Sequence, residues 1–398
     1  MATKNSQLNQ LTGEKTYTEI VFQKVWGRVE AYRKTHPQQK IFMMAFGDTT
    51  QPLTPTVVQA LVDATNRLGD PKTYTGYEDI TGNPALRKAI CANYYQQNLG
   101  IQLDPSEIFI SDGAQSASVN IQELFAPDNK VAVQNPAYPS FVEGTLLAGR
   151  TLVNLMCDEQ NNFVPKLPEE KVDLIYLCFP NNPTGAVASK ECLKAFVDYA
   201  NSCQAVIIFD AVYSPFITTP NIPRSIYEIV GAQECAIEIG SFSKMANFTG
   251  LRVGWCVIPE ALTIQNTVPG ELNQLWRIRH AVKFWGTANI SQYGAIAALS
   301  SAGQKECQEV VNYYLQNARL LREGLAEQGL KCFGGIDSPF VWVKAPQGLS
   351  SWQFFEKMLQ SKGIVGVPGC IFGSSGEGYL RLSTLGQREE ILTALENN

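Results

Sequence analysis

Histidine is scarce in this 398-residue sequence, which contains only His36 and His280. Both lie in stretches with ordinary helical patterning, and a Ser-His-Asp or Cys-His nucleophile system would have to use one of them. The ten cysteines are scattered and form no C-x-x-C motif, which argues against a zinc site and against a disulfide framework. We therefore expect no metal, and we expect the chemistry to come from a bound cofactor.

Long apolar runs and basic clusters are also missing. No stretch of about 18 apolar residues occurs, and the polar start at residues 1–7 is not followed by the apolar core of a signal peptide. Lys and Arg total 32 against 37 Asp and Glu, so the formal charge is −5. These absences predict a cytoplasmic protein that binds neither nucleic acid nor a membrane.

Apolar residues, by contrast, are abundant: 45% of the chain is hydrophobic and 17% is charged. A chain of this length suits a large domain and a smaller one. Between about 105 and 260, apolar runs alternate with helix-like segments, which is typical of an α/β fold with a mostly parallel sheet buried on both faces. The runs are Ile108–Ser111, Val131–Gln134, Leu174–Cys178, Val206–Asp210, Cys235–Gly240 and Val253–Ile258.

The pattern changes after about residue 290, where long helices are followed by strand-like pieces. These pieces are Phe340–Val343, Gly363–Val367 and Tyr379–Ser383. We expect a large domain over residues 55–290 and a small α+β domain over 291–398. The N-terminal segment, 1–54, is expected to join the small domain.

One stretch, Ser241 to Trp255, surrounds a single lysine with small and hydroxyl residues. We interpret Lys244 as the amine that holds an aldehyde cofactor as a Schiff base. Ser241, Ser243 and Arg252 are then placed to hold the phosphate of that cofactor. The alternative is a lysine in a surface loop.

Polar residues also follow two of the apolar runs directly. Asp210 ends one run, and a buried carboxylate there needs a cation or a proton donor such as a pyridinium nitrogen. Tyr213 is close enough in sequence to reach the ring oxygen, and Asn182 lies in the Pro-rich turn after Cys178. The alternatives are a helix cap for Asp210 and a plain turn around Asn182.

Three further motifs complete a candidate site. Small residues in Ser111–Ala117 open a helix and leave backbone N–H groups free for an anion. Tyr138 lies between two prolines and is suited to stacking on a planar ring. Arg381 lies in an apolar strand, where its guanidinium fits a substrate carboxylate, with an internal salt bridge as the alternative.

In this order and spacing, the residues resemble those of fold-type I pyridoxal-phosphate enzymes over nearly the whole chain. Among these enzymes the chain is most similar to the LL-diaminopimelate aminotransferase group. The motifs that carry the resemblance are Gly47-Asp-Thr-Thr-Gln-Pro, Ser111-Asp-Gly-Ala, Asn135-Pro-Ala-Tyr-Pro, Ser241-Phe-Ser-Lys, Pro368-Gly-Cys-Ile-Phe-Gly and Gly378-Tyr-Leu-Arg. The resemblance implies a sheet of the seven-stranded type in the large domain, pyridoxal 5′-phosphate as cofactor, and a homodimer with shared active sites.

The resemblance also implies a role for each site residue. Lys244 binds the cofactor and then moves a proton between the substrate Cα and the cofactor C4′. The residues implied to contact the ring are Asp210, Asn182, Tyr213 and Tyr138. Those implied to hold the phosphate are Ser241, Ser243, Arg252, the backbone of Gly113, Ala114 and Gln115, and Tyr77 of a partner subunit. The implied α-carboxylate ligands are Arg381, Asn182 and the backbone of Gly47.

Three positions depart from the pattern of the group. Gln115 stands where the group has a lysine, which removes one positive charge near the phosphate. Ile80 and Trp285 replace an acid and an asparagine that contact the distal end of diaminopimelate. We therefore expect a substrate with an apolar, aromatic or long aliphatic side chain. If Glu78 or Asp79 takes the place of the missing acid, LL-diaminopimelate remains the alternative.

Transamination with 2-oxoglutarate or a similar oxo acid is the activity that the resemblance implies. A carbon–sulfur β-lyase on the same fold is a second possibility. A catalytically silent regulator would need a DNA-binding domain, and the roughly 40 residues before the first strand are too few and not basic.

Overall fold

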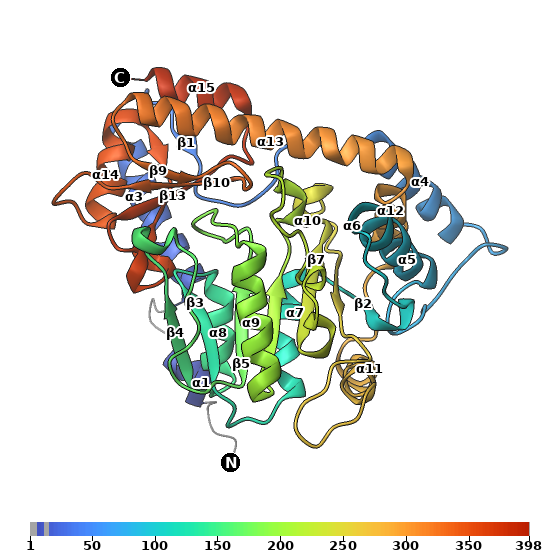
Figure 1. Ribbon diagram of the computed structural model, residues 1–398. Helices are drawn as coiled ribbons and strands as arrows, with labels where there is room; N and C mark the ends of the chain where they lie inside the picture. The colour runs from blue at the N-terminus through green and yellow to red at the C-terminus, as the bar shows by residue number, and fades with distance from the viewer. Residues whose placement is uncertain (1–5, 12–15, 398) are drawn as a thin grey trace, which may run out of the picture.

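A seven-stranded sheet forms the centre of the larger part of the molecule in the computed structural model, which describes residues 6–11 and 16–397 (Figure 1). The strand order is β2-β8-β7-β6-β5-β3-β4. Only β8 runs antiparallel to its two neighbours, β2 and β7. The strands are β2 (Ile108–Ser111), β3 (Val131–Asn135), β4 (Leu152–Met156), β5 (Leu174–Cys178), β6 (Val206–Asp210), β7 (Ala236–Ser241) and β8 (Gly254–Val257). The expected α/β fold with a mostly parallel sheet is confirmed.

All six apolar runs of the sequence become strands, with each end within one residue of its expected position. The prediction missed β4, an edge strand in which only Leu155 is buried. Because one neighbour is missing at an edge, this strand does not need the continuous apolar run that marks β5 and β6.

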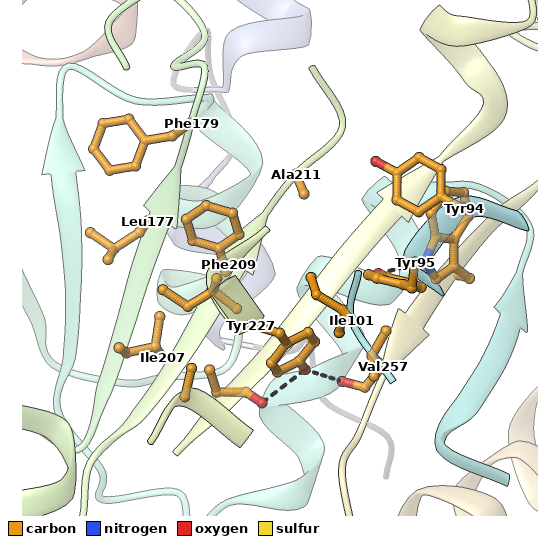
Figure 2. Close-up of a cluster of buried hydrophobic side chains, with 14 of the residues drawn as sticks. Tyr94, Tyr95, Ile101, Leu177, Phe179, Ile207, Phe209, Ala211, Tyr227 and Val257 are labelled. Carbon is orange, nitrogen blue, oxygen red and sulfur yellow. Dashed lines mark hydrogen bonds between the residues drawn. The ribbon is translucent and has the colours of Figure 1, made fainter. Parts of the chain in front are cut away.

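Successive residues of the central strands pack on opposite faces of the sheet. Ile207 and Phe209 of β6 belong to one buried cluster, and Val206 and Ile208 belong to another on the opposite face. Figure 2 shows the first cluster, in which the Tyr227 hydroxyl donates to backbone carbonyl oxygens. Both faces are therefore dry, and the polar ends of the strands are the places where chemistry can occur.

Helices cover both faces and surround the sheet. Helix α4 (Pro55–Leu68) packs on α12 (Asn289–Ala298). The other helices around the sheet are α5 (Pro84–Ala89), α6 (Gln97–Leu99), α7 (Ala114–Asn120), α8 (Pro139–Leu147), α9 (Lys190–Cys203), α10 (Phe242–Met245) and α11 (Glu271–Lys283).

Two small sheets form the rest of the core. One has the order β12-β13-β10-β9, and the other pairs β1 with β11 in parallel. These strands are β1 (Phe42–Met43), β9 (Cys332–Gly334), β10 (Phe340–Lys344), β11 (Ile364–Val365), β12 (Val367–Pro368) and β13 (Tyr379–Ser383). The helices that pack here are α2 (Tyr17–Glu19), α3 (Trp26–Thr35), α13 (Ser301–Glu327), α14 (Ser351–Lys362) and α15 (Arg388–Glu396), whereas α1 (Ser6–Gln10) packs on α8 of the larger part.

The two ends of the chain share this second core. Val21, Val25 and Val29 pack in one buried cluster with residues of α13, β10 and β13. The long helix α13 runs across the top of the molecule, from α15 at one end to α4 at the other (Figure 1). The divisions at residues 54 and 290 stay predictions. No helix in the described part of the chain is long and apolar enough to cross a membrane.

Candidate active site

A cavity of about 450 Å³ lies where the carboxyl ends of the central strands meet the small sheets. It is lined by residues that are spread over more than 360 positions of the chain, from Tyr17 to Arg381. The sequence-predicted residues that line it are Gly47, Ala114, Gln115, Tyr138, Asn182, Asp210, Tyr213, Ser241, Ser243, Lys244, Arg252 and Arg381. Twelve residues that were predicted from separate motifs thus line the same cavity.

Lys244 lies in the wall of this cavity and not in an outer surface loop. It is part of the short helix α10, whose start is fixed by a hydrogen bond from the Ser243 backbone N–H to the Ser241 hydroxyl. The Lys244 ammonium donates to the backbone carbonyl oxygen of Gly47. Burial lowers the pKa of Lys244 to about 8, because a charged amine loses hydration in the cavity. An amine with this pKa is partly neutral near pH 7 and able to act as a nucleophile or a base.

Asp210 lies at the carboxyl end of β6 and is buried. It accepts a hydrogen bond from the backbone N–H of Val212 at 2.9 Å, and no cation pairs with it among the described residues. Burial raises the pKa of Asp210 to about 6. The next helical turn, Ser214–Phe216, has no side-chain cap, so Asp210 does not cap it. A carboxyl group in this position is stabilised by a protonated ring nitrogen.

The start of α7 and the loop around Arg252 form a cradle for an anion. Gly113 has a φ of +110°, and a Cβ there would lie 2.3 Å from an Arg252 guanidinium nitrogen. A Cβ at Gly254 would lie 2.9 Å from the backbone nitrogen of Ala114. Both glycines therefore allow the guanidinium and β8 to approach the start of α7 closely. Ser241 and Ser243 line the same cavity.

Arg381 lies on β13 and is only 2% exposed. Its guanidinium donates to the Asn182 side-chain oxygen at 2.8 Å, to the Ala45 carbonyl oxygen at 2.5 Å and to the Tyr17 hydroxyl at 3.5 Å. Within the described residues no carboxylate pairs with it, so the alternative of an internal salt bridge is wrong. Arg381 keeps an uncompensated positive charge that can bind a carboxylate.

Tyr138 and Gln115 are joined at the edge of the cavity. The Tyr138 hydroxyl donates to the Gln115 side-chain oxygen at 3.1 Å. Burial raises the pKa of the Tyr138 hydroxyl, which therefore stays protonated and able to donate. Gln115 thus gives the ring of Tyr138 a second anchor in addition to the prolines on either side.

Sequence reasoning missed some of the residues in the wall. Tyr17, Phe46 and Thr249 line the cavity, although no motif marked them as site residues. Tyr17 comes from the N-terminal segment, and its ring lies 5.8 Å from that of Phe372. Asp48 also lines the cavity. Its place directly after Gly47 in a predicted motif was the one signal from which this could have been predicted.

Four predicted residues lie outside the cavity. Tyr77 is 91% exposed, Trp285 is 51% exposed, and their rings form an edge contact at 5.9 Å. Ile80 follows in the same loop as Tyr77 and is half-buried. Gly113 does not line the cavity either, but it supports Arg252 as described above.

The two carboxylates beside Ile80 already have partners in their own chain. Asp79 accepts hydrogen bonds from the backbone and the hydroxyl of Thr81, at 2.8 and 2.6 Å, and lies 3.6 Å from Arg87. Partial burial alone would raise the pKa of Asp79, but these hydrogen bonds and the Arg87 charge lower it. Glu78 accepts from the Asn83 amide at 2.9 Å and from the Tyr293 hydroxyl at 3.2 Å.

The donor set fits pyridoxal phosphate at three separate points. Lys244 is an amine of lowered pKa for the aldehyde, and Asp210 is a buried carboxyl without a cation for the ring nitrogen. The cradle of Ser241, Ser243 and Arg252 provides hydroxyls and a positive charge for the phosphate. The described residues contain no group of three or more His, Cys, Asp or Glu that could hold a metal ion.

The chain matches the family model described as aminotransferase class I and II over residues 40–397. It is 43% identical over 394 residues to the LL-diaminopimelate aminotransferase of Parabacteroides distasonis, covering 96% of each chain. The L,L-diaminopimelate aminotransferase from Chlamydomonas reinhardtii has a TM-score of 0.91 and 35% identity, covering 100% of this chain and 98% of that one. An aromatic aminotransferase from Pyrococcus horikoshii has a TM-score of 0.80 and 25% identity, covering 93% and 97%.

Proposed function

Since this chain belongs to the aminotransferase class I and II family, we propose that it transfers an amino group between an L-amino acid and a 2-oxo acid with pyridoxal phosphate held in the cavity. The observation that carries the proposal is the meeting of Lys244, Asp210 and Arg381 in one cavity. Lys244 would hold the cofactor aldehyde, Asp210 would pair with its ring nitrogen, and Arg381 would bind the substrate carboxylate. Each of the three is needed for transamination.

Bound pyridoxal phosphate supplies an aldehyde carbon for the amino group and a ring that withdraws electrons from the substrate Cα. Lys244 would hold the aldehyde of the cofactor, and its amine would move a proton between the substrate Cα and the cofactor carbon C4′. Its lowered pKa of about 8 leaves part of the amine neutral at the pH of the reaction. Asp210 would keep the ring nitrogen protonated.

The remaining residues would position the reactants. Asn182 already accepts from Arg381, so its amide group is held between the carboxylate site and the ring. Burial raises the pKa of Tyr213 well above its usual value, so its hydroxyl stays protonated and can donate to the ring oxygen. Ser241, Ser243, Arg252 and the first turn of α7 would hold the phosphate and fix the cofactor in the cavity.

Members of this family are typically dimers, and we propose that a second copy of this chain completes the site. Tyr77, Trp285 and Tyr74, which is 65% exposed, place large aromatic surface on one side of the molecule. Large apolar groups that are exposed together favour a contact with another chain. In such a dimer, Tyr77, Ile80 and Trp285 of one copy would face the cavity of the other.

A substrate with an apolar or aromatic side chain fits this arrangement. Ile80 and Trp285 offer no hydrogen bond acceptor to a distal ammonium group, because one side chain is aliphatic and the other is an indole donor. Glu78 and Asp79 are engaged by Asn83, Tyr293, Thr81 and Arg87, so neither is free to replace the missing acid without losing its partners.

LL-diaminopimelate is the second candidate substrate. The relative from Parabacteroides distasonis carries this substrate in its name and is 43% identical over 96% of the chain. If this chain uses the same substrate, its distal amino acid group must be bound by residues other than Ile80 and Trp285.

A spectrophotometric half-reaction tests both the proposed reaction class and the proposed substrate. The purified enzyme, loaded with pyridoxal phosphate, is mixed with phenylalanine, tyrosine, methionine, leucine or LL-diaminopimelate, and conversion to the pyridoxamine form is followed by absorbance. We expect the apolar amino acids to react fastest and 2-oxoglutarate to restore the starting spectrum. Faster reaction with LL-diaminopimelate would select the second substrate. Release of pyruvate and ammonia without an acceptor would indicate a β-lyase, and no spectral change with any amino acid would reject transamination.

A further inference from the structure

Two aromatic rings flank the guanidinium group of Arg381. Its central carbon, Cζ, lies 4.8 Å from the ring centroid of Phe340 and 4.8 Å from that of Phe372. Both rings are buried, and both distances are within the range of cation–π attraction, about 6 Å. Arg381 is therefore held in an aromatic clamp, formed by Phe340 and Phe372.

The other contacts of the Arg381 guanidinium are also electrically neutral. Its hydrogen bond acceptors are an amide oxygen of Asn182, a backbone carbonyl oxygen of Ala45 and a hydroxyl of Tyr17. A buried cation without hydration is costly unless nearby groups stabilise it. Here neutral oxygens and π faces do so, and no carboxylate of the described chain competes for the charge. The guanidinium is fixed in place and still able to bind an incoming anion.

Both clamp residues are fixed by elements of the site itself. Phe340 lies on β10, diagonal to Arg381 across the antiparallel pair in which Trp342 faces Arg381. Its ring also makes an edge contact with Tyr213 at 5.1 Å. The Phe372 carbonyl oxygen accepts from the backbone N–H of Ala137, next to the stacking residue Tyr138. The clamp therefore links Arg381 to both sides of the proposed cofactor site.

We propose that Phe340 and Phe372 are positioning residues for the substrate α-carboxylate and act by holding Arg381 unpaired and correctly oriented. This inference rests on the proposed function, because it takes Arg381 as the carboxylate ligand. Amino donor and amino acceptor both carry the α-carboxylate, so the clamp contributes equally to the binding of both. A residue that reads the substrate side chain would instead affect the two substrates differently.

The test uses Phe340→Leu and Phe372→Leu in the enzyme loaded with cofactor. Each removes one π face, and we expect KM for the amino acid and KM for the oxo acid to rise by the same factor, about tenfold. We expect kcat to change by less than about threefold, because uniform loss of carboxylate binding mainly affects KM. The absorbance of the bound cofactor should be unchanged. Unequal changes in the two KM values, or a fall in kcat alone, would overturn the proposal.

Two control replacements distinguish the cation–π effect of the clamp from a general loss of packing. Phe355→Leu removes an equally buried ring from α14 that, within the described part of the chain, makes no cation–π contact with Arg381, and it should lower stability without changing KM. Replacement of Phe372 by a ring-fluorinated phenylalanine keeps the ring shape but weakens its negative face, and KM should rise with the degree of fluorination. Equal KM for the fluorinated and unmodified proteins would also overturn the proposal.

Direct binding of propionate, a carboxylate without an amino group, separates this inference from the proposed function. Titration of the loaded enzyme should give a dissociation constant about tenfold higher for each Leu variant than for the parent. If the parent transaminates but propionate binds all variants equally, only the clamp is wrong. If the parent fails to transaminate any amino acid while the variants still bind propionate more weakly, the proposed function is wrong and the clamp stands.

Discussion

Two parts of the molecule are built differently. One is the floor of the cavity, which is the part of its lining formed by Lys244, Asp210 and Arg381, and the other is the pair of exposed loops that contain Tyr77 and Trp285. In the floor, Asp210 and Lys244 follow strands whose residues are all buried, and neighbours from the same chain fix each side chain. Tyr77 and Trp285 instead touch each other on the surface, at 91% and 51% exposure. The residues of the floor are brought together within one chain, whereas we propose that the exposed loops act only against a second copy of the chain.

This difference separates reaction class from substrate choice. The floor contains the groups that any amino acid needs, namely an amine, a buried acid and a carboxylate ligand. The loops contain Ile80 and Trp285, two of the three positions at which this chain departs from the group that it resembles. Changes in the floor should therefore affect all substrates alike, and changes in the loops should affect only the relative rates.

Replacement of Lys244 by alanine should have the largest effect. The variant loses the amine that we propose holds the cofactor and moves the proton, so we expect the half-reaction to slow by about 10⁴-fold or more for every amino acid. Stopped-flow absorbance measures the rate, and Lys194→Ala, on an exposed helix face, is the control. A variant that keeps even a tenth of the parental rate would show that another group does the chemistry.

Replacement of Asp210 by asparagine should slow the reaction by about 10²-fold or more. The same replacement should increase the stability of the cofactor-free protein. Without cofactor, the pKa of Asp210 is about 6 in the folded chain and lower when unfolded, so its ionisation destabilises the fold progressively as pH rises from about 4 to 6. The cofactor-free variant should therefore be more stable than the parent at pH 7.5, by about 2 to 3 kcal/mol, with little difference near pH 4.

Thermal unfolding of both cofactor-free proteins at the two pH values checks this prediction. The parent should gain more stability than the variant when pyridoxal phosphate is added, since only the parent offers a carboxylate to the ring nitrogen. Equal stability of the two cofactor-free proteins at pH 7.5 would mean that ionisation of Asp210 does not destabilise the fold.

The loops should change substrate preference without changing the class of reaction. In the double variant Ile80→Glu with Trp285→Asn, an acid and an amide become available to a distal ammonium and carboxylate. We expect the ratio of kcat/KM for LL-diaminopimelate to that for phenylalanine to rise by about 10 to 100-fold. An unchanged ratio would show that these two positions do not contact the substrate. The loops would then not determine substrate choice separately from the floor.

Gln115→Lys should have the smallest effect. The added charge lies at the exposed edge of the cavity near the proposed phosphate cradle, so we expect cofactor affinity to increase only by a few-fold. The same change removes the acceptor of the Tyr138 hydroxyl. Equilibrium dialysis of pyridoxal phosphate at low and high salt measures the effect, which should shrink as salt screens the charge. Weaker binding at low salt would mean that the Tyr138 anchor contributes more than the charge.

Much of the fold follows from local pattern. The six apolar runs predicted six strands, because a strand buried on both faces needs a continuous apolar sequence. The edge strand β4 was missed because an edge has no such requirement. The small sheets were harder to delimit, since β1 and β11 have only two residues each and depend on pairing across about 320 positions.

The sequence by itself determined which polar residues gather at one site, because the residues after buried strands must converge at the carboxyl edge of a parallel sheet, and the resemblance of its motifs implied the reaction class. Lys244, Asp210 and Asn182 are of this kind. Only the tertiary structure decided that Arg381 has no carboxylate partner among the described residues, that Phe340 and Phe372 pack against it, and that Tyr77 and Trp285 are exposed and lie outside their own cavity. Local pattern encodes strand ends, whereas contacts between distant segments depend on how the whole chain packs.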